Sequence, residues 1–331
     1  MKALVTGAIG FVGSALVRHL LQRGDRVRVL ARSASAAAPL SQLGAEVCLG
    51  DLATPASVAG ITAGIEVVFH LASVMRGSAA DFERVDVRGT EQLLAESQRA
   101  GVGRYVYAGT LAGYPPPRDH RDSTVIDERT PLDDSGRLGN YARAKARCER
   151  MVLAANGAKT ECVVVRLGLV CGVGANVFPP HVCKVIGRNR VVLFGDGGVP
   201  LPLILIDNAV DALVLGATVP GVGGETFNVV DDDTVTQKEY LEWLRKCTGG
   251  VPHVLSLPLA AYYLLGLLSE LSAKATRTEP ETTRYRIRSR LARVQWDCSK
   301  AKRLLHWQPR VALREGLALS FRRYAAQAAG G

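Results

Sequence analysis

The chain has 331 residues, of which 47% are hydrophobic and 22% charged, a composition typical of globular and not of disordered proteins. The formal net charge of +10 suits nucleic acid, anionic membranes or phosphate-bearing ligands as partners. Seven cysteines without a CxxC pair argue against a disulfide-stapled secreted protein and a metal site, so we expect a cytoplasmic location. Thr6 and Gly7 interrupt the first apolar stretch, and no apolar run reaches about 18 residues, so neither a signal peptide nor a membrane-spanning helix is expected.

Short β-branched runs alternate with helical patterns along the chain. Strands are predicted at 2–6, 26–31, 45–51, 64–72, 104–109 and 161–168, and helices at 11–23, 81–100 and 139–156. Later elements are strands at 202–206 and 226–230 and a helix from Asn208, while 33–40 (SASAAAPL) is predicted to be a loop. This alternation predicts an α/β fold with a doubly wound parallel sheet. We expect a dinucleotide-binding domain at 1–170, its sheet completed by about 202–230, and a smaller, partly helical C-terminal substrate-binding region at 171–201 and 231–331.

The segment TGAIGFVG (6–13) places three glycines between a predicted strand and a predicted helix. A strand, a glycine-rich turn and a helix form the dinucleotide site of a Rossmann fold. Gly7 permits the tight turn, Gly10 admits a pyrophosphate close to the backbone, and Gly13 lets the helix pack closely. The start of the helix then offers free N–H groups and a partial positive charge to the phosphates.

Further motifs follow this turn along the chain. They are GDL (50–52), HLAS (70–73), VYAGTLAGY (106–114), YARAK (141–145) and RLGLVCG (166–172). Together with the glycine turn, they resemble the extended short-chain dehydrogenase/reductases, which include the NAD-dependent epimerases and dehydratases and the 3β-hydroxysteroid dehydrogenase type. The resemblance covers nearly the whole chain and implies a Rossmann domain that binds NAD or NADP.

Tyr141 and Lys145 are spaced i, i+4 in a predicted helix and therefore share one face. Because a nearby ammonium favours phenolate, we expect Lys145 to lower the pKa of Tyr141 and make it a general acid/base for an alcohol–carbonyl pair. By the resemblance, Thr110 takes the place of the catalytic serine or threonine and holds the substrate oxygen. The resemblance also makes Tyr114 a pocket wall and puts Asp86 where the family often has asparagine. An ionised aspartate cannot donate a hydrogen bond, so we expect a structural role for Asp86.

The second predicted strand ends at Ala31 and is followed by Arg32 and Ser33. An NAD-preferring protein has an acid at this point to bind the ribose hydroxyls. Because no carboxylate is present and Arg32 can pair with a 2′-phosphate, we predict NADP, with NAD as the other cofactor. By the resemblance, residues 51 and 52 flank the adenine, and residues 71 and 72 line the dinucleotide. The predicted cofactor-binding residues are Gly7, Gly10, Phe11, Val12, Gly13, Arg32, Ser33, Asp51, Leu52, Leu71, Ala72, Tyr141 and Lys145.

The residues after Thr110 bear on the reaction. Related dehydratases and decarboxylases carry an acid there, whereas this chain has Leu-Ala-Gly at 111–113, which disfavours both reactions. The segment 199–203 (VPLPL) lacks the arginine that clamps the diphosphate in sugar-nucleotide members. The cations that would replace it are Lys184, Arg188 or Arg190. We predict a reductase or dehydrogenase of an apolar, steroid- or lipid-like alcohol or ketone. The alternatives are a nucleotide-sugar epimerase and a non-catalytic protein that senses the dinucleotide.

The C-terminal third combines an apolar segment (255–271) with an arginine-rich segment (283–293). The first is apolar on nearly every side, which predicts a helix that is buried or inserted in lipid but too short to span a bilayer. In an extended segment, the arginines at 284, 286, 288 and 290 would share one face. Two interpretations stay open: a core helix with solvated or ligand-binding arginines, or a peripheral contact with an anionic membrane. The other expected partners are a small-molecule substrate and a second copy in a homodimer, with no nucleic acid.

Overall fold

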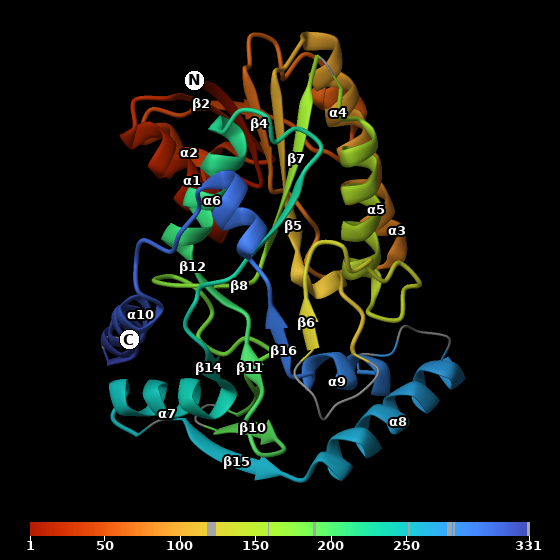
Figure 1. The fold of residues 1–331 in the computed structure, drawn as a ribbon, viewed down its shortest axis with the longest axis vertical. Coiled ribbons are helices and arrows are strands. Elements are labelled where there is room, and N and C mark those ends of the chain that lie inside the picture. Colours follow the sequence, from red (N-terminus) through yellow and green to blue (C-terminus); the bar gives the residue numbers. More distant parts are fainter. Residues whose placement is uncertain are drawn as a thin grey trace.

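The central sheet of this computed structural model consists of seven parallel strands in the order β13-β7-β5-β4-β1-β2-β3 (Figure 1). The structure describes residues 1–117, 124–157, 159–187, 190–250, 252–276, 280 and 282–329. The strands are β1 (Lys2–Thr6), β2 (Arg26–Ala31), β3 (Glu46–Leu49), β4 (Val67–His70), β5 (Arg104–Thr110), β7 (Glu161–Leu167) and β13 (Thr226–Val229). The order reverses between β1 and β4, where doubly wound sheets bind ligands beyond their carboxyl edge. The predicted fold class is confirmed.

Helices cover both faces of the sheet (Figure 1). One face carries α1 (Phe11–Gln22), α2 (Ala34–Gln42) and α6 (Ile206–Thr218), and the other carries α4 (Arg88–Ala100) and α5 (Asn140–Ala154). Three short helices precede α4 in the chain: η1 (Pro55–Val58), α3 (Ala79–Asp81) and the π-helical η2 (Phe82–Val87). Neighbouring strand residues point to opposite faces, so Val5 packs in the α1 and α6 core while Leu4 packs in the α4 and α5 core.

The segment predicted as a loop at 33–40 is helical, so that prediction was wrong. Four of the nine residues of α2 are alanines, and alanine has the highest helix propensity of all residues. Ser33 caps the helix, since its hydroxyl accepts a hydrogen bond from the N–H of Ala36 at 3.5 Å. Pro39 lies inside the helix without ending it.

The rest of the chain forms a smaller unit below the sheet (Figure 1). Its strands pair as β8 (Leu169–Cys171) with β12 (Leu203–Leu205), β11 (Pro200–Leu201) with β14 (Val235–Thr236), β6 (Thr124–Ile126) with β16 (Val294–Trp296), and β9 (Lys184–Ile186) with β10 (Arg190–Phe194) and β15 (His253–Leu257). Its helices are α7 (Gln237–Cys247), α8 (Leu259–Thr276), α9 (Arg284–Arg290) and α10 (Leu313–Ala329). Two short helices lie with the central sheet: η3 (Leu111–Gly113) packs against α5, and η4 (Ala301–Leu305) packs against α6 and β13.

One of the two late strands joins the central sheet and the other does not. The strand predicted at 226–230 is β13, the outermost strand beside β7. The strand predicted at 202–206 is β12, which pairs with β8 outside the central sheet, so its predicted place was wrong. The chain turns away from the sheet at Gly168, where an added Cβ would lie 2.3 Å from the carbonyl oxygen of Pro202.

The apolar segment at 255–271 is mostly solvent-facing, so it is not a core helix. It forms β15 and most of α8, in which only Gly266 and Ala273 are buried. Leu264, Leu265, Leu268 and Leu271 are 47–56% exposed. Within the described part of the chain, no helix combines the length and the apolarity that crossing a bilayer requires.

The arginine-rich segment is also not extended, because residues 284–290 form α9. Alternate arginines therefore point in different directions and meet different partners. Arg284 pairs with Glu270 of α8 at 2.9 Å, and Arg288 donates to the carbonyl oxygen of Pro117 at 2.5 Å. The common arginine face that an extended segment would have does not form.

Candidate active site

The turn after β1 has the close approaches that its glycines predict. Gly7 has a φ of +68°, and a Cβ at this position would lie 2.7 Å from the backbone nitrogen of Ala72. At Gly13 a Cβ would lie 2.1 Å from the carbonyl oxygen of Gly7, so α1 can begin this close to the turn only with glycine. At exposed Gly10, a Cβ would meet only that same oxygen, at 3.2 Å, so the space beyond is open. No side chain caps the start of α1 and its first turn holds no acid, so the residues fit a bound pyrophosphate.

A cavity of about 960 Å³ opens beyond the carboxyl ends of β1, β4 and β5. Every residue predicted to bind the cofactor or to act in catalysis lines it, except Ser33, which caps α2 instead. Arg32 lies at one end of the cavity and is exposed, and none of the described carboxylates lies within ion-pair distance of its guanidinium. The structure therefore gathers residues from six separate segments around one space.

Thr110, Tyr141 and Lys145 meet at this cavity. Thr110 ends β5, while Tyr141 and Lys145 come from the first turns of α5. The side chains of Thr110 and Tyr141 both line the cavity. The buried Lys145 Nζ donates to the carbonyl oxygen of Ala108 at 2.6 Å and lies 4.2 Å from the ring centroid of Tyr107. Thr110, Tyr141 and Lys145 thus line one cavity together.

The pKa of Tyr141 differs from the sequence prediction. Burial raises this pKa, the side chain of Thr110 lowers it, and the charge of Asp86 raises it, with a net upward shift. The prediction that Lys145 lowers the pKa of Tyr141 was wrong, because the ammonium is directed at the carbonyl of Ala108. Burial also lowers the pKa of Lys145. In this structure Tyr141 keeps its proton at neutral pH, which is the state that can donate it.

Asp86 ties the loop after β4 to the helix that follows. It lies in η2, is 2% exposed, and accepts hydrogen bonds from the Ser73 hydroxyl and from the N–H of Val74 at 3.0 Å. Ser73 and Val74 line the cavity. Burial raises the pKa of Asp86, and the two hydrogen bonds oppose that shift. Its carboxylate therefore shapes the cavity wall next to Tyr141.

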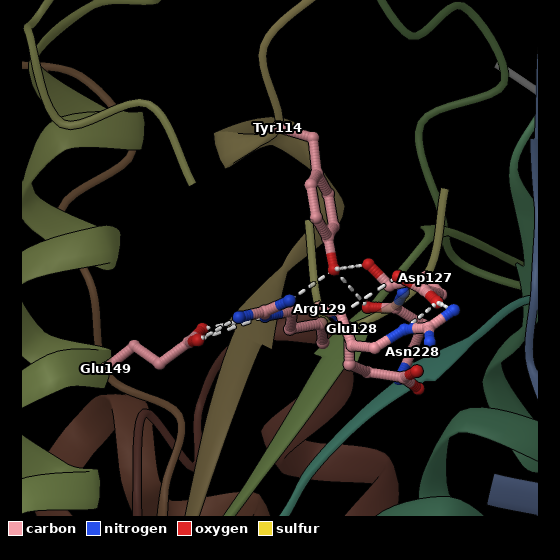
Figure 2. Close-up of polar contacts among 7 residues, drawn as sticks. Tyr114, Asp127, Glu128, Arg129, Glu149 and Asn228 are labelled. Carbon is pink, nitrogen blue, oxygen red and sulfur yellow. Dashed lines mark hydrogen bonds and ion pairs between the residues drawn. The ribbon is translucent and has the colours of Figure 1, made fainter. Parts of the chain in front are cut away.

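A buried polar network joins Tyr114, Glu149 and Asn228 (Figure 2). Arg166 of β7 forms an ion pair with Glu149 of α5, and its Nε donates to both carboxylate oxygens at 3.0 and 3.1 Å. Arg166 also donates to the hydroxyl of Tyr114, which in turn donates to Oδ1 of Asn228 at 2.9 Å. The Tyr114 ring lines the cavity and packs on Trp296 with ring centroids 5.5 Å apart. The network therefore joins the cavity wall to the helix that carries Tyr141.

Comparison with known proteins identifies the family. The model of the NAD dependent epimerase/dehydratase family matches residues 3–229, which include the glycine turn and all three predicted catalytic residues. The chain belongs to the NAD-dependent epimerase/dehydratase family. The resemblance to the extended short-chain dehydrogenase/reductases is thus confirmed, and the protein is an NAD(P)-dependent enzyme of the oxidoreductase/epimerase type.

Four known proteins are similar to this chain over almost its full length. A 2-alkyl-3-oxoalkanoate reductase of Stenotrophomonas maltophilia is 30% identical over 96% of this chain and 97% of its own length. A farnesyl-dihydroquinoline-oxide ketoreductase of Stigmatella aurantiaca is 32% identical over 96% of this chain and 95% of its own. The crystal structure of gox2253 has a TM-score of 0.79 and 25% identity, covering 98% of each chain. UDP-glucose 4-epimerase of Thermotoga maritima, at 22% identity and a TM-score of 0.74 over 99% of this chain and 100% of its own, shares the fold.

The part of the cavity away from the glycine turn includes residues that sequence analysis did not assign to the site. Its apolar wall includes Val199, Leu201, Pro202, Ala292 and Trp296, and its polar or charged residues include Arg76, His181, Ser289 and Arg290. Of the cations expected to replace the diphosphate clamp, Lys184 and Arg190 do not line the cavity, and Arg188 lies outside the described residues. These wall residues come from distant segments without a fixed spacing, so sequence analysis could not group them. The one sequence feature that pointed to this part of the cavity was the arginine-rich segment.

Proposed function

We propose that this family member is an NADPH-dependent reductase, reversible as a dehydrogenase, that interconverts a ketone and a secondary alcohol on an apolar, steroid- or lipid-like molecule. The observation that carries this proposal is the single cavity in which Thr110 and Tyr141 meet a largely apolar wall. The names of the relatives, a 2-alkyl-3-oxoalkanoate reductase and a farnesyl-bearing ketoreductase, support a lipid-like ketone.

NADPH, when bound along the glycine turn, supplies a hydride to the carbonyl carbon. The Thr110 hydroxyl donates a hydrogen bond to the carbonyl oxygen, and the Tyr141 phenol donates a proton to that oxygen as charge develops on it. The ketone thus gains one hydride and one proton to become the alcohol, and solvent returns the proton to Tyr141. The raised pKa of Tyr141 suits this direction, because the group starts protonated. Lys145 lines the same cavity and donates from its ammonium to the carbonyl oxygen of Ala108, one strand residue away from Gly109 and two from Thr110, so it holds this end of β5 in place.

We propose that Arg32 selects NADP by pairing with the 2′-phosphate beside the start of α2. Arg32 is exposed at the cavity end, and Ser33 lies next to it at the helix N-cap. In this proposal residues 1–170 bind the dinucleotide, with β13 completing their sheet, and residues 171–201 and 231–331 bind the substrate.

The test is a spectrophotometric assay of NADPH oxidation with a panel of long-chain 2-alkyl-3-oxo esters, steroid ketones and UDP-glucose. We expect ketone-dependent oxidation that is faster with NADPH than with NADH, and alcohol product in equal amount. Epimerisation of UDP-glucose without net NADPH consumption would instead support the epimerase alternative. Tight NADPH binding with no turnover on any ketone would support the dinucleotide sensor.

We further propose that the enzyme is cytoplasmic and rests on an anionic membrane through the exposed leucines of α8 (264, 265, 268 and 271). Burying a whole leucine is worth about 1.5–3 kcal/mol, so inserting these four half-exposed side chains supplies about 3–6 kcal/mol. The net charge of +10 complements an anionic surface. Because Tyr262 of α8 bonds to the cavity residue Arg290, the leucine face lies beside the cavity from which an apolar substrate would be loaded.

Flotation with phosphatidylserine vesicles tests this contact. Leu264→Ser with Leu268→Ser should abolish flotation, whereas Leu319→Ser on α10, which is similarly exposed at 53%, should not. Light scattering without lipid measures the homodimer that we also propose. The membrane contact would be refuted if the unmutated protein never floated with the vesicles and the double variant became monomeric in light scattering. That result would assign the leucine face to the dimer interface.

A further inference from the structure

The wall of the cavity carries an excess of positive charge. Among the described residues that line it, the one carboxylate is Asp51, which follows β3 at the end assigned to the adenine. Lys145 lines the part beside Tyr141, and the cations of the remaining wall are Arg76 and Arg290. An apolar space with unbalanced cations favours an anionic guest over a neutral one.

Arg290 is the cation with the clearest geometry. It is the last residue of α9 and is half-buried, and its Nη1 donates to the Tyr262 hydroxyl at 3.1 Å. Tyr262 is itself held by stacking on Phe194, with ring centroids 3.8 Å apart and an interplanar angle of 10°. The guanidinium is therefore positioned by a fixed ring and not by a flexible side chain.

Arg290 differs from the other arginines of its segment in its partners. Arg284 pairs with Glu270 and Arg293 pairs with Asp196, at 2.9 and 3.0 Å. No carboxylate in the described part of the chain lies within 4.0 Å of the Arg290 guanidinium. Its charge thus faces the cavity without a protein counter-ion.

His181 does not add a second positive charge beside Arg290. The neighbouring charge of Arg290 lowers the pKa of the exposed His181 imidazole, so the ring is neutral at pH 7. The side-chain amide of Gln237 donates to the backbone oxygen of His181 at 2.6 Å and fixes the loop that carries it. Arg290 and His181 together present a fixed cation and a neutral hydrogen-bonding ring to the cavity.

We propose that the substrate of this enzyme carries a carboxylate and that Arg290 binds it, with His181 beside it. This inference rests on the proposed function and names the substrate class more narrowly, as an apolar-chain hydroxy or oxo acid. A guanidinium fork matches the two oxygens of a carboxylate. The apolar walls at Val199 and Leu201 leave the rest of the substrate to hydrophobic contact.

The experiment measures binding of a stable 2-alkyl-3-hydroxy acid, and of its methyl ester, to the NADP⁺-saturated protein by calorimetry. Arg290→Gln should weaken binding of the acid by about 10- to 100-fold and leave the ester within about 2-fold. Arg293→Gln, in the same segment but paired with Asp196, is the matched control and should change neither. Tyr262→Phe keeps the charge but removes its support, so the acid should lose less affinity than in Arg290→Gln.

Equal loss of acid and ester binding in Arg290→Gln would show that Arg290 only supports the wall, and unchanged acid binding would exclude the contact; either result overturns the inference. Arg290-dependent binding of UDP-glucose, with none of the acid, would assign the site to a diphosphate and also overturn it. Failure of the proposed function looks different: the acid would still bind through Arg290, but neither acid nor ester would be oxidised.

Discussion

Glu149→Gln tests whether the buried ion pair holds α5 in place. The side chains of Arg166 and Glu149 are 7% and 4% exposed, so the substitution leaves a guanidinium without a counter-charge in the interior. Two unit charges about 4 Å apart attract by about 4 kcal/mol at an effective dielectric constant of about 20. Breaking buried pairs on one side costs about 3–5 kcal/mol, and because glutamine keeps one acceptor we expect about 3 kcal/mol. This is a large share of the 5–15 kcal/mol that typically stabilises a domain.

Urea unfolding followed by circular dichroism measures this loss. Asp134→Asn is the matched control, because Asp134 pairs with Arg150 of the same helix at 2.8 Å but both side chains are more than half exposed, so the cost should stay below about 1 kcal/mol. Glu149→Leu with Arg166→Met should recover most of the stability, since no buried charge is left. A loss below about 1 kcal/mol in Glu149→Gln, or a double variant less stable than the single one, would refute the reasoning.

The other predictions concern the cofactor, the pH profile and acid stability. Arg32→Ala should reduce the preference for NADPH over NADH by about 10- to 100-fold in fluorescence titrations, and equal affinities in the unmutated protein would contradict the assignment. Asp86→Asn should lower the pKa of Tyr141, because it removes a charge that raises that pKa, and should move the alkaline limb of the kcat profile for reduction to lower pH; an unmoved limb would show that Asp86 does not act on Tyr141. Burial lowers the pKa of His70 to about 3 from an ordinary 6.5, so the unfolded chain binds the proton first and stability should fall below pH 6.5, by about 2 kcal/mol from this residue at pH 5. Unfolding free energies at pH 7 and 5 measure this loss, and a His70→Asn variant with the same pH dependence would exclude His70 as its source.

The sheet and the dinucleotide site were predictable because local signals determine them. The β-branched runs at 2–6, 104–109 and 161–168 form β1, β5 and β7 within one residue of their predicted ends. The roles of the glycines at 7 and 13 could be predicted because backbone atoms of the fold lie so close to each of them that no Cβ fits there. Backbone geometry of this kind leaves a direct trace in the sequence.

The contact partners of individual side chains and their burial could not be predicted from the sequence, because tertiary contacts decide both. The apolar pattern of α8 is equally consistent with a core helix, yet its leucines face outward. The pKa of Tyr141 depends on where the Lys145 ammonium points, and an i, i+4 spacing does not reveal that it donates to Ala108. Arg290 shares its spacing with Arg286 and Arg288, and only the fold brings it to the cavity.

The most direct test of the catalytic assignment is Tyr141→Phe, assayed for turnover and for NADPH binding on the same preparation. The change keeps the ring and removes only the proton donor. The account predicts turnover of the best apolar ketone that is lower by about 10²- to 10⁴-fold, with NADPH affinity unchanged within about 2-fold. Near-full turnover in Tyr141→Phe would contradict the assignment of Tyr141 as the proton donor.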